Sequence, residues 1–296
     1  LVLRTEAVHA MSFTDENRFY GAMTTDGQKQ NKLPIASIKD KRTEKYTWTN
    51  TASYGFDIDH LHNFSFLLGQ ELQSRQTKET FMKNRYFPRY ITADKALSNM
   101  NLGKPWESTS SLSTPERTAS FFGQANYNYD HKYLVSVTMR ADGSSKYQEH
   151  WGYFPSVGAA WVLSEESFLK DQKWIDFLKL RASWGKLGND QVAASDGFAS
   201  IATGNAASGV FGNSTIAGYQ NSTYFSWLKW EVVEEWNAGI NFITLNNRLN
   251  IDVDYYHRMT NNAVIAPLLP FSTTTLAGNY GKILNSGIDV SANWND

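Results

Sequence analysis

Histidine and aspartate residues come together at one place in the sequence where they could bind a metal. His60 and His62 form a His-x-His sequence beside Asp57 and Asp59. Alternate residues of a strand share a face, so both imidazoles could reach one ion. A metal site needs further ligands at a recognisable spacing, and no closing motif follows. We therefore predict a polar turn here and no metal site.

Paired carboxylates are the second arrangement that could do chemistry. Glycoside hydrolysis needs two carboxyl groups that face each other about 5–10 Å apart. Glu234 and Glu235 are neighbours in a predicted strand and so point to opposite faces, while Glu165 and Glu166 suit the first turn of a helix. The sequence has no cysteine, which excludes disulfides and thiolate chemistry. We predict that the chain is not an enzyme and binds no cofactor.

Aromatic residues, which make up 14% of the sequence, suit binding better than catalysis. Tyr127, Tyr129 and Tyr133 cluster at a predicted short turn, where an aromatic girdle would mark a membrane–water interface. Other aromatic residues lie in or beside long connections. They could stack on a sugar, with loop packing as the alternative: Trp106, Tyr219, Tyr224, Phe225 and Trp227.

Charge and hydropathy narrow the class of protein. There are 28 Lys and Arg residues against 29 Asp and Glu, with no basic stripe, so we expect no nucleic-acid partner.

No stretch reaches the roughly 18 apolar residues of a membrane-spanning helix, although a closed barrel can also cross lipid. The first residues, 1–6, carry charge and lack a signal-peptide core, so we expect an internal fragment of a longer protein.

Apolar and polar residues alternate along most of the chain. From Tyr133 to Met139 the odd positions are apolar, whereas Ser136, Thr138 and Arg140 are polar. This period of two predicts strands with one apolar and one polar face. Ten strands are expected, near residues 2–12, 44–58, 63–75, 117–129, 132–142, 152–163, 177–187, 228–244, 248–259 and 282–295.

The connections between these strands are mostly long and short in turn. The short ones are 59–62, 130–131 and 245–247, and the segment from Ser164 to Trp174 is expected to form a small helix with Ser164 as its N-cap. Outer-membrane barrels have short turns at one end and long loops at the other. The pattern predicts an all-β, antiparallel, up-and-down transmembrane β-barrel. A soluble β-rich carbohydrate-binding module with one wet face is the alternative.

Six segments of the second half of the chain form a recognisable series. In chain order they are Arg140–Lys146 (RADGSSK), Trp151–Trp161 (WGYFPSVGAAW), Ser164–Leu169 (SEESFL), Leu178–Asn189 (LKLRASWGKLGN), Asn247–Tyr256 (NRLNIDVDYY) and Asn285–Asp289 (NSGID). This series resembles the SusC/RagA family of TonB-dependent outer-membrane transporters of Bacteroidetes. The resemblance is strongest across residues 118–294.

The resemblance implies a 22-stranded barrel in the outer membrane with an N-terminal plug. A SusD-like surface lipoprotein would cap it, TonB would act on the plug, and the substrate would be a glycan or a peptide. Residues 1–296 would then be part of the barrel, with plug, signal peptide and C-terminal strands outside them. In such a barrel we expect some polar residues to face the lumen: Arg140, Lys179, Arg181, Asp252, Asp254 and Asp289.

Overall fold

The fold is almost entirely β-structure. The computed structural model describes residues 1–170, 172, 174–192, 228–268 and 277–295 in full, and the backbone alone of the short strands within 201–220. No helix in these residues has the length and apolar character needed to cross a membrane. The main sheet has 11 strands: β1 (Val2–Tyr20), β2 (Ile35–Ile58), β3 (His62–Arg85), β4 (Lys104–Leu112), β5 (Glu116–Tyr129), β6 (Tyr133–Ser144), β7 (Trp151–Val162), β8 (Phe177–Asn189), β13 (Glu231–Thr244), β14 (Leu249–Ile265) and β15 (Gly278–Trp294).

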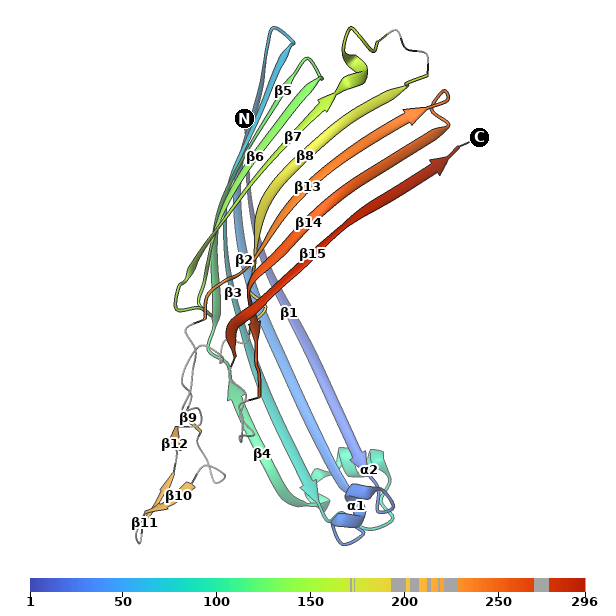
Figure 1. Cartoon of the computed structure of the whole chain (residues 1–296). Coiled ribbons are helices and arrows are strands. Elements are labelled where there is room, and N and C mark those ends of the chain that lie inside the picture. The colour runs from blue at the N-terminus through green and yellow to red at the C-terminus, as the bar shows by residue number, and fades with distance from the viewer. Residues whose placement is uncertain are drawn as a thin grey trace. The chain divides into compact units, whose positions relative to one another are not determined.

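The strands lie in the order β1-β2-β3-β5-β6-β7-β8-β13-β14-β15, with β4 paired to β3 (Figure 1). All ten predicted strands are present, and several run further than the alternation indicated. The predicted strands 63–75 and 117–129 left residues 76–116 as a connection, which was wrong, because β3 continues to Arg85 and β4 then pairs back onto it. Four short strands form two separate hairpins: β9 (Ile201–Ala202) with β12 (Tyr219–Gln220), and β10 (Ser208–Phe211) with β11 (Ser214–Ala217).

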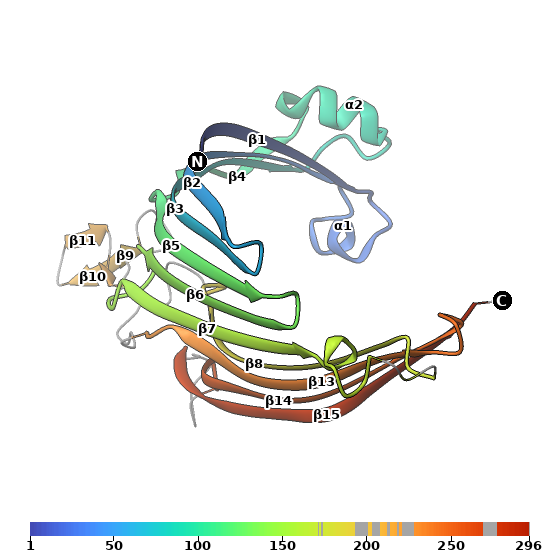
Figure 2. The same cartoon turned by 90° about the horizontal axis from the view of Figure 1, so that it is seen from above.

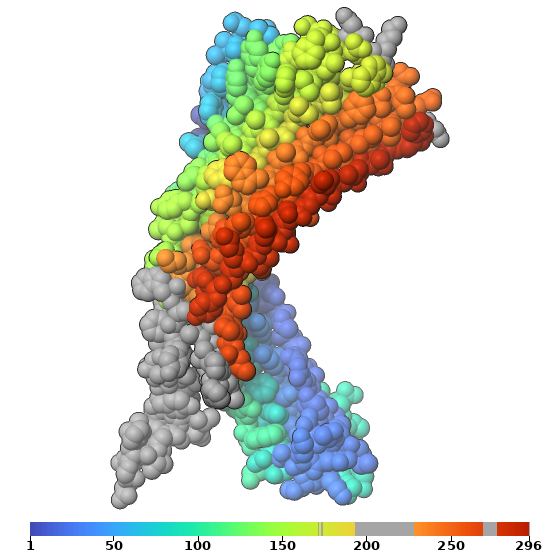
Figure 3. All heavy atoms as spheres, in the orientation of Figure 1, coloured from blue at the N-terminus to red at the C-terminus, as the bar shows by residue number. Residues whose placement is uncertain are grey.

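Two compact units are distinguished along the chain. Unit 1 contains residues 1–5, 49–72 and 118–296, and unit 2 contains residues 6–48 and 73–117. In unit 1, β5 to β8 and β13 to β15 lie side by side and form a curved sheet (Figure 2). The side chains of β13, β14 and β15 form a continuous surface in Figure 3.

An apolar face runs across the strands of unit 1 because their registers match. Val137 pairs with Val157, Val157 with Trp184, and Trp184 with Trp236, which makes one row over β6, β7, β8 and β13. On β6 this apolar face is exposed, with Val137 46% accessible, whereas the alternate polar residues are half-buried. Apolar residues that are more exposed than polar ones suit a sheet with lipid on one side.

Tight turns join the strands at one end of unit 1. Asp59 and His60, and then Asp130 and His131, have positive φ, a conformation that Asp, Asn and His adopt more easily than most residues. The turn after β5 has three residues, 130–132, and the turn after β13 has four, 245–248, each one more than predicted.

The predicted helix from Ser164 to Trp174 was wrong. In the part of this segment that the structure describes, residues 164–170, 172 and 174, the helical structure is a 3₁₀ turn, η2 (Leu163–Glu165), whose N-cap is Val162. The Ser164 hydroxyl has no hydrogen-bond partner among the described residues, so it caps nothing. The carboxylate of Glu166 accepts hydrogen bonds from side chains on β6 and β7 instead of facing a helix terminus.

Unit 2 has its own small core where its strands meet helices. Two short helices, α1 (Thr25–Lys29) and α2 (Ala93–Ser98), and the 3₁₀ turn η1 (Met100–Leu102) connect the strands. Phe87 and Ala96 are fully buried and pack with Ala36 and Met100. These contacts hold the β3–β4 connection against the start of β2 within this unit.

Candidate binding site on the polar face

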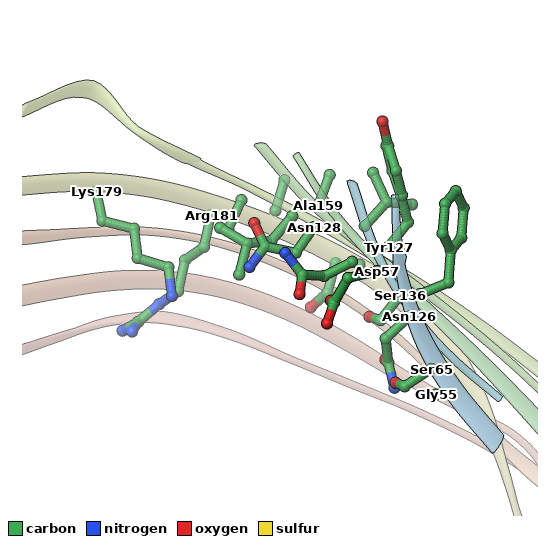
Figure 4. Close-up of a pocket in the computed structure, with 18 of the residues that line it drawn as sticks. Gly55, Asp57, Ser65, Asn126, Tyr127, Asn128, Ser136, Ala159, Lys179 and Arg181 are labelled. Atoms are coloured by element: carbon green, nitrogen blue, oxygen red, sulfur yellow. The ribbon is translucent and has the colours of Figure 1, made fainter. Parts of the chain in front are cut away.

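A pocket of about 670 Å³ lies on unit 1 and is lined by β2, β3, β5 to β8 and β13. Lys179 and Arg181 point to the same side of the sheet as Asn126, whereas Tyr127 points to the other side (Figure 4). Period-two alternation of β5 and β8 produces this arrangement. We call it the polar-face pocket.

Amide and hydroxyl groups line one part of the polar-face pocket. Asn126 Nδ2 donates to Ser65 Oγ at 3.1 Å and Gln124 Nε2 donates to Asn126 Oδ1 at 3.3 Å. Oδ1 of Asn128 is buried and has no hydrogen-bond partner among the described residues. A buried acceptor without a partner is costly, so this oxygen is suited to receive a donor from water or a ligand. Such groups recognise sugar hydroxyls or peptide amides.

An ion-pair network extends from Arg181, which lines another part of the pocket. Arg181 Nε donates to Asp254 Oδ1 at 3.1 Å and its Nη2 donates to Oδ2, so the contact is bidentate. Asp252 lies 3.6 Å from Nη2 and also accepts a hydrogen bond of 2.9 Å from Asn241. Two carboxylates therefore share one guanidinium, which reduces their mutual repulsion.

A glycine makes the Arg181–Asp254 contact possible. In the register, Gly239 of β13 stands between Arg181 of β8 and Asp254 of β14. A Cβ placed at Gly239 would come within 2.2 Å of Asp254 Oδ1 and 2.6 Å of Arg181 Nε. The two side chains meet over this residue because it has no side chain of its own.

The structure brings most of the six predicted polar residues into one area. Arg181, Asp252 and Asp254 form the network, Lys179 lines the same pocket, and Asp289 is opposite Asp254 on the edge strand β15, where it is exposed. Arg140 lies outside this network and has other partners. Its Nε donates to Asp142 at 2.8 Å and its Nη2 to Ser120 at 3.1 Å.

The predicted aromatic cluster at the short turn includes residues that the sequence did not link. Tyr129 and Tyr133 have ring centroids 6.1 Å apart, and Tyr133 stacks on Trp161 of β7 at the same distance. Glu166 accepts hydrogen bonds from Tyr133 Oη at 2.6 Å and Trp161 Nε1 at 2.9 Å. These two bonds, Tyr133 first, lower the pKa of the Glu166 carboxyl.

His62 takes part in this aromatic cluster. Its Nδ1 lies 2.8 Å from Tyr127 Oη, and its ring is 4.9 Å from that of Tyr129. Within the described ranges, no three His, Cys, Asp or Glu side chains are grouped as metal ligands would be. The His-x-His sequence thus provides a hydrogen-bond and stacking partner at the turn.

Trp106 is the predicted sugar-stacking residue whose surroundings can be described. It lies in β4, not in a loop, is 42% exposed, and has the Lys83 ammonium 4.3 Å from its ring centroid. The backbone of Tyr219 is in β12, but its side chain, and all of Tyr224, Phe225 and Trp227, lie outside the described residues.

A second aromatic cluster was not predicted. Tyr147 is fully buried, its ring lies 4.9 Å from that of Trp230, and Phe154 contacts Trp230 edge-on at 5.4 Å. Tyr147 Oη donates to the carbonyl of Asn189 at 3.0 Å, and burial raises the pKa of the phenol. One feature of the sequence could have indicated this cluster: Phe154 is an apolar residue at a polar-face position of β7.

Comparisons with known proteins agree with this architecture. Residues 6–295 match the family model described as "TonB dependent receptor-like, beta-barrel". The chain is 34% identical over 189 residues, 61% of its length, to the TonB-dependent receptor SusC of Bacteroides thetaiotaomicron. It is 28% identical over 298 residues, 94% of its length, to the TonB-dependent receptor P26 of Formosa agariphila.

Solved structures show the same fold. The RagAB peptide transporter superposes with a TM-score of 0.82 at 24% identity, over 98% of this chain and 32% of that one. The chain spans 19% of the length of SusC and 28% of the length of P26. The resemblance to SusC and RagA is thus confirmed, and the chain belongs to the family of TonB-dependent receptor-like β-barrels of the outer membrane.

Proposed function

We propose that the chain is part of the wall of a TonB-dependent importer that carries oligomeric nutrients, glycans or peptides, across the outer membrane. The main support is that the sheet of this family member has one apolar and one polar face. An exposed apolar row crosses β6 to β13, while the opposite face carries amides, hydroxyls and ion pairs. A soluble carbohydrate-binding module has no reason to expose such a row to water.

The polar face would line the lumen, and six of its residues would contact the transport path: Arg140, Lys179, Arg181, Asp252, Asp254 and Asp289. Their role is to hydrate and guide a polar substrate, with no covalent step and no cofactor. The bidentate Arg181–Asp254 contact keeps the charges nearly balanced, which favours passage of neutral as well as charged solutes.

Other components would complete the importer. A plug domain elsewhere in the whole protein would close the barrel and contact TonB, and a SusD-like surface lipoprotein would help to capture the substrate. The pairing with a lipoprotein is tested by affinity purification of the intact receptor from outer membranes. Recovery of a stoichiometric surface lipoprotein is expected, and a receptor that is always purified alone would argue against the pairing.

The transport function is tested by uptake. Cells with and without the intact gene would be given fluorescent oligosaccharide and peptide pools, with and without a protonophore. Energised import predicts accumulation that needs both the gene and the proton gradient. Uptake that persists without the gradient would indicate a passive pore instead.

A further inference from the structure

We propose that Trp106, Lys83 and Arg85 in unit 2 form a subsite for an anionic sugar residue, one that carries a carboxylate or a sulfate ester. The proposal deepens the proposed function, since it assigns a charge class to part of the substrate. It rests on the strand pairing of β3 with β4 and on the contacts of these three side chains.

A β-bulge places Trp106 beside the two cations. Lys83 pairs with Glu107, but the next residue, Asn84, pairs with Pro105, so Trp106 is the extra residue on β4. Bulges re-aim side chains and are common next to functional sites. Here Trp106 has the Lys83 Nζ 4.3 Å and the Arg85 Cζ 5.0 Å from its ring centroid.

Among the described residues, carboxylates offset the positive charges at this bulge only in part. In the part of the chain that the structure describes, Lys83 and Arg85 have no carboxylate within 4.0 Å. Lys104 is opposite Arg85 in the register and adds a third cation, against the single carboxylate of Glu107. Arg85 is oriented by a 3.2 Å hydrogen bond from Nη1 to Gln30 Oε1. Neighbouring cations repel one another, and a bound anion would offset this unfavourable energy.

A pocket of about 370 Å³ adjoins this positive end. Lys83 and Glu107 line it, together with the hydroxyl of Thr109 and the rings of Phe81 and Tyr20. Elsewhere in the pocket the charges are paired, Lys39 with Glu79 at 3.0 Å and Arg18 with Glu16. The unpaired positive charge is therefore confined to the Trp106 end. An anion would bind there, with its ring and hydroxyls against the aromatic and hydroxyl groups.

Equilibrium binding to the intact receptor in detergent tests the proposal. The probes are oligogalacturonate, oligosaccharides of dextran sulfate, neutral dextran oligosaccharides and oligoglutamate. We expect an anionic saccharide to bind more tightly than the neutral one. The double variant Lys83→Gln/Arg85→Gln should weaken that binding at least tenfold, since two charge-assisted hydrogen bonds are lost. Binding should also weaken as salt is raised.

Matched variants separate the subsite from general charge and from misfolding. Lys78→Gln removes an exposed cation of the same strand at the opposite face and should leave binding unchanged. Trp106→Phe should keep most of the affinity and Trp106→Ala should lose it. Equal binding by wild type and double variant, binding by oligoglutamate only, or no preference for an anionic saccharide would each overturn the proposal. Because this assay needs neither TonB nor a proton gradient, its failure would leave the uptake experiment unaffected.

Discussion

At the scale of single residues, two sets of contacts in unit 1 leave little room for change. The Arg181–Asp254 pair crosses a glycine, and Glu166 joins two aromatic side chains from neighbouring strands. In both arrangements a charged side chain is held by specific hydrogen-bonding partners, and its position would be unfavourable without them. Each makes a specific prediction.

Gly239→Ala should destabilise the barrel. The new methyl group would overlap Asp254 Oδ1 and Arg181 Nε, so the bidentate pair must separate. Overpacking of this kind costs about 1–3 kcal/mol. Thermal unfolding of the intact receptor in detergent measures the change. Gly55→Ala is the matched control, since its nearest contact would be 3.4 Å, and equal stability of the two variants would contradict the close approach.

Acidification should release the connection after β7. The pKa of Glu166 is lowered by Tyr133 and Trp161, so its hydrogen bonds stabilise the folded state above the carboxyl's ordinary pKa and are lost as pH falls through the lowered value. We expect a change in Trp161 fluorescence as the pH falls below the ordinary pKa of a glutamate carboxyl. The change should be absent in Glu166→Gln, and an identical titration in both proteins would refute the assignment.

At the scale of elements, the strands were predictable and their ends were not. Alternation over Tyr133–Met139 requires only local information, because residues two apart share a face. The η2 turn follows from a non-local contact, since Glu166 bonds to Tyr133 on a neighbouring strand. The bulge at Trp106 likewise depends on how β4 pairs with β3. No single-sequence pattern contains such partners.

The face assignment of β6 can be tested by charge. Val137→Arg would place a guanidinium on the exposed apolar row, which costs about 2–4 kcal/mol near the bilayer midplane. Heat-modifiable migration of outer-membrane fractions would report reduced assembly. Thr138→Arg, one residue along on the polar face, should have a mild effect. Equal assembly of the two variants would invalidate the lipid-facing assignment.

The loop between β6 and β7 should depend on Tyr147. Its buried ring packs on Trp230 and its hydroxyl bonds to Asn189. Tyr147→Ala removes both and should cost about 3–5 kcal/mol locally, whereas Tyr147→Phe should cost about 1 kcal/mol. Protease cleavage within 145–150 measures the opening. Similar cleavage rates in wild type and Tyr147→Ala would show that the cluster does not anchor this loop.

At the scale of the whole chain, the sheet described has apolar residues on one face and free backbone groups at its edges. The strand order begins with β1 and ends with β15, and Ile288 and Val290 of β15 are each 67% exposed. Edges of this kind pair with other strands. The polar candidates could be placed from the alternation, but their pairing into one network required the register.

Residues 1–296 expressed alone should not give a detergent-free monomer. Exposed apolar rows and open edges favour aggregation in water. Size-exclusion chromatography with and without detergent tests this. A monodisperse, detergent-free protein that binds glycan would revive the soluble module. An intact receptor purified in parallel serves as the control for the detergent conditions.

The strand order also has a kinetic consequence. Most neighbouring strands in unit 1 follow each other along the chain, as β5 and β6 do across a three-residue turn, so their pairing needs only short loop closures. The pairing of Glu231 with Asn189 must close a much longer connection. The entropy of closure is greater there by roughly 2 kcal/mol. The meanders β5–β8 and β13–β15 should therefore form early and separately, and β8 should pair with β13 last.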